Sequence, residues 1–409
     1  MNLITEPNAE TRPSLIGVAA LTRRCYEGEN LIPLGQALLA RAEENPMDAN
    51  AHLDLSTVLL LTGNGEHGLA VQTEAIKLQP LYSLPAAAPS LRLLAIKGPG
   101  DLMANTPVEF LLENSDVSLE LLYLLPDAQW PDTVPDHDVM MVAVGESDEN
   151  QALLSRLAGY VSDWPRPVIN HPERIAALSR DGVCAVLKGA PGIEIPVTTR
   201  VSRAELQALA DGGRNMESFL PDGGFPIIVR PLGSHAGTHL DKLPTAADIT
   251  AYLEQVPAEG FYISRFVDYR GSDGLFRKYR IALIEGKPFV CHFAVSEHWI
   301  IHYANAGMSE SAEKRAEEAR VMETFDTDFA VRHRAALQAI HDRMGLPYLG
   351  VDCAETLTGD LLIFEVDNSM VVHALDPEDV FPYKKPAMQK VFTAFRQMLE
   401  HARQTAIAG

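Results

Sequence analysis

The chain has 409 residues, too many for one ordinary hydrophobic core, so two or three domains are expected. Its 46% hydrophobic and 22% charged residues are typical of a globular protein and not of a disordered one. The formal net charge of −21 argues against a broad surface for nucleic acid or for an acidic membrane, although it still allows a local basic cleft for a small anion.

Cysteine usage and the N-terminal residues bear on the compartment. The four cysteines are widely spaced and form no CxxC pair, which indicates a reducing compartment and neither a zinc site nor a disulfide framework. The first residues lack the basic start and apolar core of a signal peptide. The apolar run at residues 58–61 is too short to span a bilayer. The expected location is the cytoplasm, with no membrane contact.

The first clear pattern is helical and begins at Leu31. Two amphipathic helices are predicted, separated by a Thr-Gly-Asn-Gly break at residues 62–65. Pro46 and Pro80 stand 34 residues apart, which is the period of a tetratricopeptide repeat. Residues 1–85 are therefore expected to form a small all-α, tetratricopeptide-like segment. It would either dock a protein partner or cap the next domain, and the small number of repeats favours the cap.

A Pro- and Ala-rich stretch at residues 82–90 predicts a linker, after which strands alternate with helices. Strands are predicted at residues 91–96, 119–125, 139–144 and 168–170, with helices at residues 107–113 and 150–160. This alternation is typical of an α/β layer with a parallel sheet, expected over residues 90–172. A Gly-rich turn at residues 97–101 lacks a phosphate-binding fingerprint and is interpreted as a simple turn.

The remaining residues, 173–409, carry most of the chemistry. An apolar strand ends in Arg230 and leads into the loop Gly233-Ser234-His235-Ala236-Gly237. A cation at a strand end, beside flexible backbone N–H groups, suits a polyphosphate. Further elements are predicted as strands at residues 261–268, 281–285 and 288–293, a basic loop at residues 270–280, and helices at residues 308–323, 329–344 and 392–404.

An acidic hairpin near the C-terminal end is the most informative stretch. A turn at residues 357–360 would pair Thr356 with Leu361 and would set Asp352 directly opposite Glu365. Like charges that face each other on a sheet are destabilising. A hard divalent cation held by oxygen ligands would remove that penalty. A solvated hairpin without an ion fits the same residues, so both interpretations stay open.

The alternation of the second strand adds a third carboxylate to this hairpin. Glu365 and Asp367 are expected on one face, together with Asp352 from the first strand. The opposite face is expected to be the core face, with Leu362, Phe364 and Val366. Cys353 should point away from the carboxylates and be a buried small hydrophobe.

A histidine-rich passage, CHFAVSEHWIIHY, surrounds Trp299. The spacing of His292, His298 and His302 fits no standard zinc motif, so roles in a substrate pocket or in the core are favoured. The dipeptide Lys384-Lys385 is interpreted as a solvated pair.

Four features occur in a fixed order: the passage from Asn170 to Pro196, the strand at residues 228–231 with its Gly loop, Tyr279-Arg280-Ile281, and the acidic hairpin. As an ordered set over about residues 90–400, they resemble the ATP-grasp superfamily, in the branch of glutathione synthetase and the ribosomal-protein glutamate ligases. The resemblance implies an α+β and α/β fold. An α/β domain would precede two α+β subdomains that clamp ATP, and the helical segment would precede all of them.

The resemblance also implies residues that bind nucleotide. Arg230 stands where the family usually has a lysine on the ATP α- and β-phosphates. The loop with Gly233, Ser234, His235 and Gly237 would fold over the phosphates. An earlier family lysine has Arg180 or Lys188 as its counterpart. The strand whose backbone would bond the adenine edge contains Ile263, Arg265, Phe266 and Val267, although the family commonly has Glu where Ser264-Arg265 stand.

At the reacting end, Arg280 matches an Arg that faces the γ-phosphate and the acyl phosphate, and Asn305 matches a polar residue of a nearby loop. A structural ion pair is the alternative role for Arg280. Asp352 and Glu365 match magnesium ligands. Asp367 replaces the usual Asn, which would give the Mg²⁺ site one more negative charge.

The activity that the resemblance implies is that of an ADP-forming carboxylate–amine ligase. MgATP would activate a carboxylate as an acyl phosphate, and an amine would then form the amide. The substrates would be small molecules or peptides. An ATP-dependent phosphotransferase and a non-catalytic nucleotide-binding scaffold with a helical docking surface are the alternatives. No nucleic-acid partner is expected, and a homodimer stays open.

Overall fold

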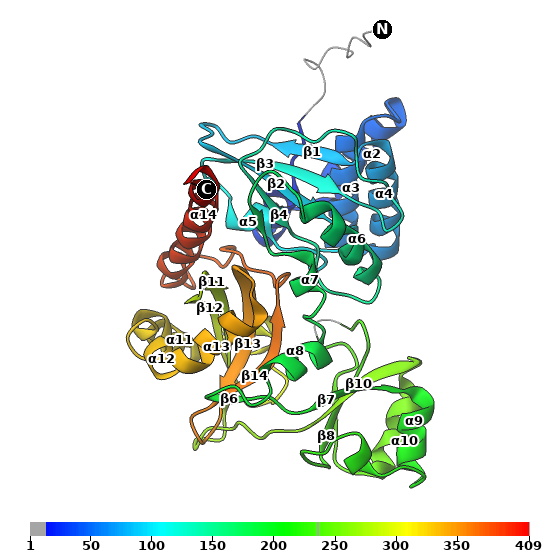
Figure 1. Cartoon of the computed structure of the whole chain (residues 1–409), viewed down its shortest axis with the longest axis vertical. Helices are drawn as coiled ribbons and strands as arrows, with labels where there is room; N and C mark the ends of the chain where they lie inside the picture. The colour runs from blue at the N-terminus through cyan, green and yellow to red at the C-terminus, as the bar shows by residue number, and fades with distance from the viewer. Residues whose placement is uncertain (1–13, 235–236, 409) are drawn as a thin grey trace.

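The computed structural model describes residues 14–234 and 237–408, which form a helical segment followed by three sheets (Figure 1). The helical segment contains α1 (Val18–Tyr26), α2 (Ile32–Glu44), α3 (Ala49–Leu61) and α4 (Gly65–Leu78). The predicted helix pair corresponds to α3 and α4, with the break where it was expected. The helices meet around a small apolar core that includes Leu21, Leu38, Leu55 and Val58. Helix α1 was not predicted because its nine residues mix apolar and basic side chains without a long repeat.

The first sheet follows with the strand order β1-β3-β2-β4-β5. Its elements are β1 (Leu81–Leu84), β2 (Leu91–Lys97), β3 (Val117–Tyr123), β4 (Val139–Val142) and β5 (Val168–Ile169), with helices α5 (Val108–Leu111) and α6 (Gln151–Val161). Strands β2 to β5 pair in parallel, as predicted.

Strand β1 is a departure from the predicted linker. It pairs antiparallel with β3, and Leu81 lies opposite Leu122. Tyr82 anchors it, because its ring is 1% exposed and its hydroxyl donates to the Ala75 carbonyl at 2.8 Å. The Pro- and Ala-rich composition that follows masked this four-residue strand.

The second sheet is antiparallel, with the order β7-β10-β8-β9. Its strands are β7 (Thr198–Ser202), β8 (Ile227–Pro231), β9 (Asp241–Leu243) and β10 (Gly260–Arg265), and it carries α9 (Arg203–Ala210), α10 (Ala246–Gln255) and the 3₁₀ turn η1 (Met216–Ser218). Capping boxes at Ser202 and Thr245 begin the two α-helices. A separate apolar core joins these helices to the sheet.

The third sheet has the order β12-β11-β13-β14-β6. Its strands are β6 (Ile193–Glu194), β11 (Phe276–Ile284), β12 (Lys287–Ser296), β13 (Tyr348–Glu355) and β14 (Leu361–Asp367). Its helices are α7 (Pro172–Ile175), α8 (Arg180–Leu187), α11 (Ala312–Thr324), α12 (Phe329–Arg332) and α13 (Arg334–Met344), with the 3₁₀ turn η2 (Tyr303–Asn305). Strand β11 begins inside the stretch predicted as a basic loop, because buried Phe276 and Tyr279 stand among the Lys and Arg residues that suggested a loop.

The acidic hairpin is β13 and β14, and its register differs from the prediction near the turn. Leu361 pairs with Glu355 and not with Thr356, because the turn is longer than predicted. A β-bulge then shifts the pairing, so that Asp352 lies opposite Glu365 as predicted.

The bulge also separates the side chains that were expected to share one core face. Val366 packs in the same core as Leu361 and Ile363, with helices α8 and α13. Leu362 and Phe364 belong to a different cluster on the other side of the sheet. Cys353 is buried on the helix side, away from Asp352, as predicted.

The long helix α14 (Lys384–Ala408) ends the described chain and ties the sheets together. Phe395 and Leu399 pack in one core with residues of β2 and β3 from the first sheet and with Ala282 of β11. Figure 1 shows α14 alongside both regions. The fold class is thus confirmed as mixed α/β preceded by helices, while the exact division at residues 85, 90 and 172 stays a prediction. No helix in the described part of the chain is long and apolar enough to cross a membrane.

Candidate active site

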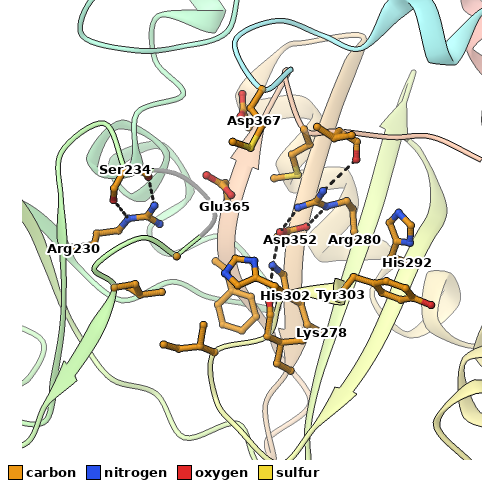
Figure 2. A pocket seen from close by; sticks show the side chains of 18 of the residues that line it. Arg230, Ser234, Lys278, Arg280, His292, His302, Tyr303, Asp352, Glu365 and Asp367 are labelled. Atoms are coloured by element: carbon orange, nitrogen blue, oxygen red, sulfur yellow. Dashed lines mark hydrogen bonds and ion pairs between the residues drawn. The ribbon is translucent and has the colours of Figure 1, made fainter. Parts of the chain in front are cut away.

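A cavity of about 1180 Å³ opens between the second and third sheets and extends to the first sheet and the helical segment. Most of the residues predicted to bind nucleotide or metal line it. They are Arg180, Arg230, Gly233, Ser234, Gly237, Arg265, Phe266, Val267, Arg280, Asp352, Glu365 and Asp367. Figure 2 shows how the cations and carboxylates of β8, β11, β13 and β14 converge there.

Arg230 lies on β8 and is 8% exposed. Its guanidinium donates to the Ser234 carbonyl and, at 3.2 Å, to the Ser234 hydroxyl (Figure 2). Burial and the neighbouring charge of Arg180 lower the pKa of Arg230 to about 10, so it stays protonated at neutral pH. The positive φ of Gly233 lets the chain turn so that Ser234 reaches this cation.

Arg180 begins α8, and its guanidinium reaches β14. It forms an ion pair with Glu365 and donates to the Phe364 carbonyl at 3.1 Å. Burial alone would raise the pKa of Glu365, but the positive charges of Arg180, Arg230 and Lys278 together outweigh it, so the pKa is lowered. Glu365 is therefore a carboxylate at neutral pH.

Arg280 on β11 donates two hydrogen bonds to the carboxylate of Asp352 on β13, at 2.8 and 2.9 Å (Figure 2). Lys278 adds an ion pair to the same carboxylate at 2.6 Å. Asp352 is 1% exposed. Burial opposes its ionisation, yet the two cations hold its pKa well below the ordinary range. Asp352 also raises the pKa of Arg280 against the effect of burial.

Asp367 ends β14 at the boundary with the first sheet. Its carboxylate accepts from the Ser369 N–H at 3.0 Å and from the Ser369 hydroxyl at 2.9 Å. The adjacent Asn368 is completely buried and donates to the Val144 carbonyl at 3.0 Å, while Thr106 donates to the Asn368 carbonyl at 2.8 Å. These bonds fix the position of Asp367 relative to the first sheet.

The three predicted metal ligands offer oxygen donors, which are the donors that Mg²⁺ prefers. Asp352 and Glu365 lie opposite each other on one sheet and Asp367 follows on the same strand, so the donor set fits a hard cation in its chemistry. Each of the first two is neutralised by arginine or lysine, so a bound Mg²⁺ would share or replace those partners.

A second polar group lies beside Arg280, around His292 and His373. His292 is opposite Arg280 on β12. The ligand atoms of His292, His373 and Asp376 all lie within 4.8 Å of one another, the one such group of metal-ligand type among the described residues. The ammonium of Lys384 lies 3.1 Å from Asp376 and 3.4 Å from the Nδ1 of His292, so this group already has a cation.

Burial governs the protonation of this group. Burial, with help from the Lys384 charge, lowers the pKa of His292 well below its ordinary value, and burial lowers that of His373 as well. Both imidazoles are therefore neutral at neutral pH. Lys384 is 3% exposed, so its interpretation as solvated is wrong, while Lys385 is exposed as expected.

No protein-family model and no curated protein sequence matches the chain. Its structure is similar to a RimK-domain ATP-grasp protein from Sphaerobacter thermophilus, with 16% identity, a TM-score of 0.42, and coverage of 72% of this chain and 98% of that one. It is also similar to the VanG D-Ala:D-Ser ligase from Enterococcus faecalis, with 13% identity, a TM-score of 0.45, and coverage of 76% of this chain and 99% of that one. A third similar structure is the D-alanine–D-alanine ligase from Coxiella burnetii, with 12% identity, a TM-score of 0.47, and coverage of 78% of this chain and 97% of that one. At these identities the likeness concerns the fold alone.

The predicted adenine strand is only partly available to a ligand. Ile263 is 1% exposed, and its strand is paired on both sides, with Thr199 and Val229 opposite Ile263. Arg265 forms ion pairs with Glu194 and Asp222, so its guanidinium is committed to protein partners. Phe266 and Val267 follow β10 and line the cavity, but the Phe266 N–H donates to the Pro226 carbonyl at 2.9 Å, which leaves Val267 as the better candidate.

The structure does not bring every predicted residue into the cavity. Lys188 is exposed at the end of α8 and is not part of the lining, so Arg180 is the better counterpart of the family lysine. Asn305 is exposed, and its side chain accepts from the His302 N–H at 3.0 Å, which caps η2 and does not reach the cavity. His235 lies outside the described residues.

Two charged residues at the centre of the cavity were not predicted as site residues. Lys278 lies two positions before Arg280, and strand alternation puts both on one face, which was a usable signal. Glu146 follows β4 at the carboxyl edge of the parallel sheet, where ligands commonly bind. Burial raises the pKa of Glu146 to about 7.

Proposed function

We propose that the protein is an ATP-dependent, ADP-forming carboxylate–amine ligase that forms an amide or peptide bond. The observation that supports this most is the pairing of Arg180, Lys278 and Arg280 with the carboxylates of one hairpin, inside a cavity between two sheets that Arg230 also lines. Such a cavity suits a polyphosphate and a hard cation together. The sequence resemblance to ATP-grasp ligases supports the same activity.

In the proposed reaction, a substrate carboxylate oxygen attacks the γ-phosphorus of ATP. The bond to the β–γ bridging oxygen breaks, and ADP leaves with that electron pair. The product is an acyl phosphate. An amine nitrogen then attacks the acyl carbon, phosphate departs, and the nitrogen loses a proton to give the amide.

The residues of the cavity would act by position and charge. Arg230 and its Gly loop would hold the α- and β-phosphates, because Ser234 of that loop already accepts hydrogen bonds from the guanidinium. Arg280 and Lys278 would meet the transferring phosphoryl group. Phe266 and Val267 would meet the base beyond the end of β10.

Asp352, Glu365 and Asp367 would hold Mg²⁺. When bound, Mg²⁺ would supply positive charge to the phosphate oxygens of ATP. The residues themselves would orient the hairpin against β11, since Asp352 is tied to Arg280 and Lys278.

Release of ADP and phosphate tests the proposal. Purified protein with MgATP and a panel of carboxylates and amines should release both products only when a suitable pair is present. Glu365→Ala should abolish this turnover. Nucleotide binding without any ADP release would support the scaffold alternative, whereas a stable phosphorylated product would support the phosphotransferase. Arg270→Ala is the control, because Arg270 is exposed, does not line the cavity, and forms its ion pair with the neighbouring Asp268.

A further inference from the structure

The cavity does not end at Arg280. It continues past the histidine group to the N-terminal helical segment, which supplies part of its wall. Tyr26 of α1, Leu60 and Leu61 of α3, Gly63 and Gly65 line the cavity. The loop after β2 lines it next to them with Asp101, Leu102 and Met103. The helical segment therefore borders the space where a substrate would lie.

The helical segment is attached firmly to the first sheet. Within the segment, the buried carboxylate of Asp54 on α3 accepts from the backbone N–H groups of Ile16 and Gly17 at 2.9 and 3.0 Å, which holds the start of α1 against α3. Glu109 of α5 accepts from the Val18 N–H at 2.7 Å at the start of α1. Glu109 also pairs with buried Lys97 of β2 at 3.4 Å. Buried charged bonds of this kind are costly to break, so the segment keeps its place.

The same segment holds the loop that lines the cavity. Gln72 of α4 makes two bonds to Gly100: its amide donates to the Gly100 carbonyl at 2.9 Å, and its oxygen accepts from the Gly100 N–H at 2.7 Å. Gln72 is 5% exposed. Leu102 and Met103 come directly after this anchor, so the helical segment determines where these apolar side chains lie.

A third contact connects the segment to the histidine group. The ring of Tyr26 meets the ring of His373 edge-on, with 5.4 Å between their centroids. Ala19 of α1, Phe110 of α5 and Leu375 share a small apolar cluster. The chain from His373 to Asp376 thus rests on α1, and the wall is continuous from His292 to the helices.

The two ends of the cavity differ in chemistry. The Arg280 end holds paired charges, whereas the helical end presents Leu60, Leu61, Leu102 and Met103. We propose that the helical end binds an apolar hydrocarbon group of a substrate, attached several carbons from the carboxylate or amine that reacts beside Arg280. This assignment of the reacting group rests on the proposed ligase function. The tetratricopeptide-like segment then forms the part of the cavity wall that determines which substrates the ligase accepts.

Direct binding tests this without any turnover. The probes are hexanoate and hexylammonium, each compared with its three-carbon analogue, propanoate or propylammonium, by NMR titration of the full chain. Burial of the three additional methylenes predicts roughly tenfold or tighter binding for the longer member of one pair. A preference for hexanoate assigns the apolar group to the carboxylate substrate, and a preference for hexylammonium assigns it to the amine substrate.

Two glycine variants provide a matched pair. A Cβ at Gly65, the first residue of α4, and one at Gly159, within α6, would each meet no heavy atom within 4 Å. Only Gly65 lines the cavity. Gly65→Phe should weaken hexanoate or hexylammonium binding about tenfold, while Gly159→Phe leaves it unchanged. Tyr26→Ala should also weaken it, and its exposed ring makes a folding defect a minor concern.

Failure of this inference is distinguishable from failure of the ligase proposal. If neither six-carbon probe binds the wild-type protein better than its three-carbon analogue, the apolar site is disproved. Equal binding by the Gly65 and Gly159 variants also disproves it. If the chain-length preference and the Gly65 effect are found but no ADP is ever released, the apolar site stands and the ligase proposal falls.

Discussion

Charge is balanced in two different ways at the Arg280 centre and at the neighbouring Lys384 centre. At the first, one buried carboxylate, Asp352, is held by two cations, Arg280 and Lys278. At the second, one buried cation, Lys384, is shared between two carboxylates, Asp376 at 3.1 Å and Glu318 at 3.7 Å. The Arg280 centre therefore has positive charge to offer an anionic ligand, whereas the Lys384 centre has none to spare.

The neutral donors around the carboxylates differ as well. Glu318 is fully buried, but it accepts from the hydroxyls of Tyr303 and Tyr383, both at 2.7 Å, and from the Phe293 N–H at 3.1 Å. The bonds to the Asp352 carboxylate described above all come from cations. Loss of a cation should consequently cost more at Asp352 than at Glu318, because a buried carboxylate with neutral donors keeps part of its solvation.

The largest effect is expected for Arg280→Met. The substitution removes the bidentate partner of Asp352 and leaves it with Lys278, so the free energy of unfolding should fall by about 3 kcal/mol. Urea denaturation of wild type and variant measures this difference. In the control, Arg270→Met breaks an exposed pair with Asp268 and should change stability by less than about 1 kcal/mol. Equal losses in the two variants would contradict the buried-pair argument.

A smaller effect, of about 2 kcal/mol, is expected for Lys384→Met. The variant removes the cation from Glu318, which keeps three neutral donors, and from Asp376, whose side chain is 13% exposed and therefore keeps contact with water. The double variant Lys384→Met with Tyr303→Phe removes one of those donors and should lose about 1 kcal/mol more. Urea denaturation of the series checks the order. A loss at Lys384 that exceeds the loss at Arg280 would reverse the comparison.

Much of the Arg280 centre could be predicted from sequence, because it rests on local rules. Alternation and hairpin register placed Asp352 opposite Glu365, and the chain order of the motifs placed Arg230 and Arg280 in the same site. The register near the turn was wrong by one residue because the turn is longer than predicted, and the bulge at Phe364, which has no signal in the sequence, then restored the predicted pairing. The error cancelled at the carboxylates.

The Lys384 centre and the part of the cavity wall formed by the helical segment could not be predicted, because each joins segments far apart in the chain. Tyr26 meets His373, and Lys384 meets His292, only once α1 and α14 have packed on the sheets. A Lys-Lys pair gives no periodic sign of burial, so Lys384 was assigned to solvent. The predicted place of Asn305 in the site was missed for a different reason, because its side chain caps a turn locally.

The smallest effect on stability is expected at Glu146, a titratable residue of the cavity that follows β4 of the first sheet. Burial raises its pKa to about 7, with the charges of Asp148 and Asp367 acting in the same direction and Arg200 and Gln151 opposing them. The folded state therefore holds a proton that the unfolded state releases above its ordinary pKa of about 4.3. The stabilisation is complete below that value and is lost as the pH rises to 7.

Glu146→Gln removes this titration and keeps the side-chain shape. Relative to wild type, the free energy of unfolding of the variant should be unchanged at pH 4 and higher at pH 8, where wild type must bury a carboxylate. The expected gain is about 1 kcal/mol, well below the full linkage value, because solvent screens this partly exposed side chain. Urea denaturation at pH 4, 6 and 8 measures the trend, and Glu149→Gln, at a neighbouring exposed position, is the control. A variant that is less stable at pH 8 would mean that ionised Glu146 has a cation partner there, and the charged centre would then extend into the first sheet.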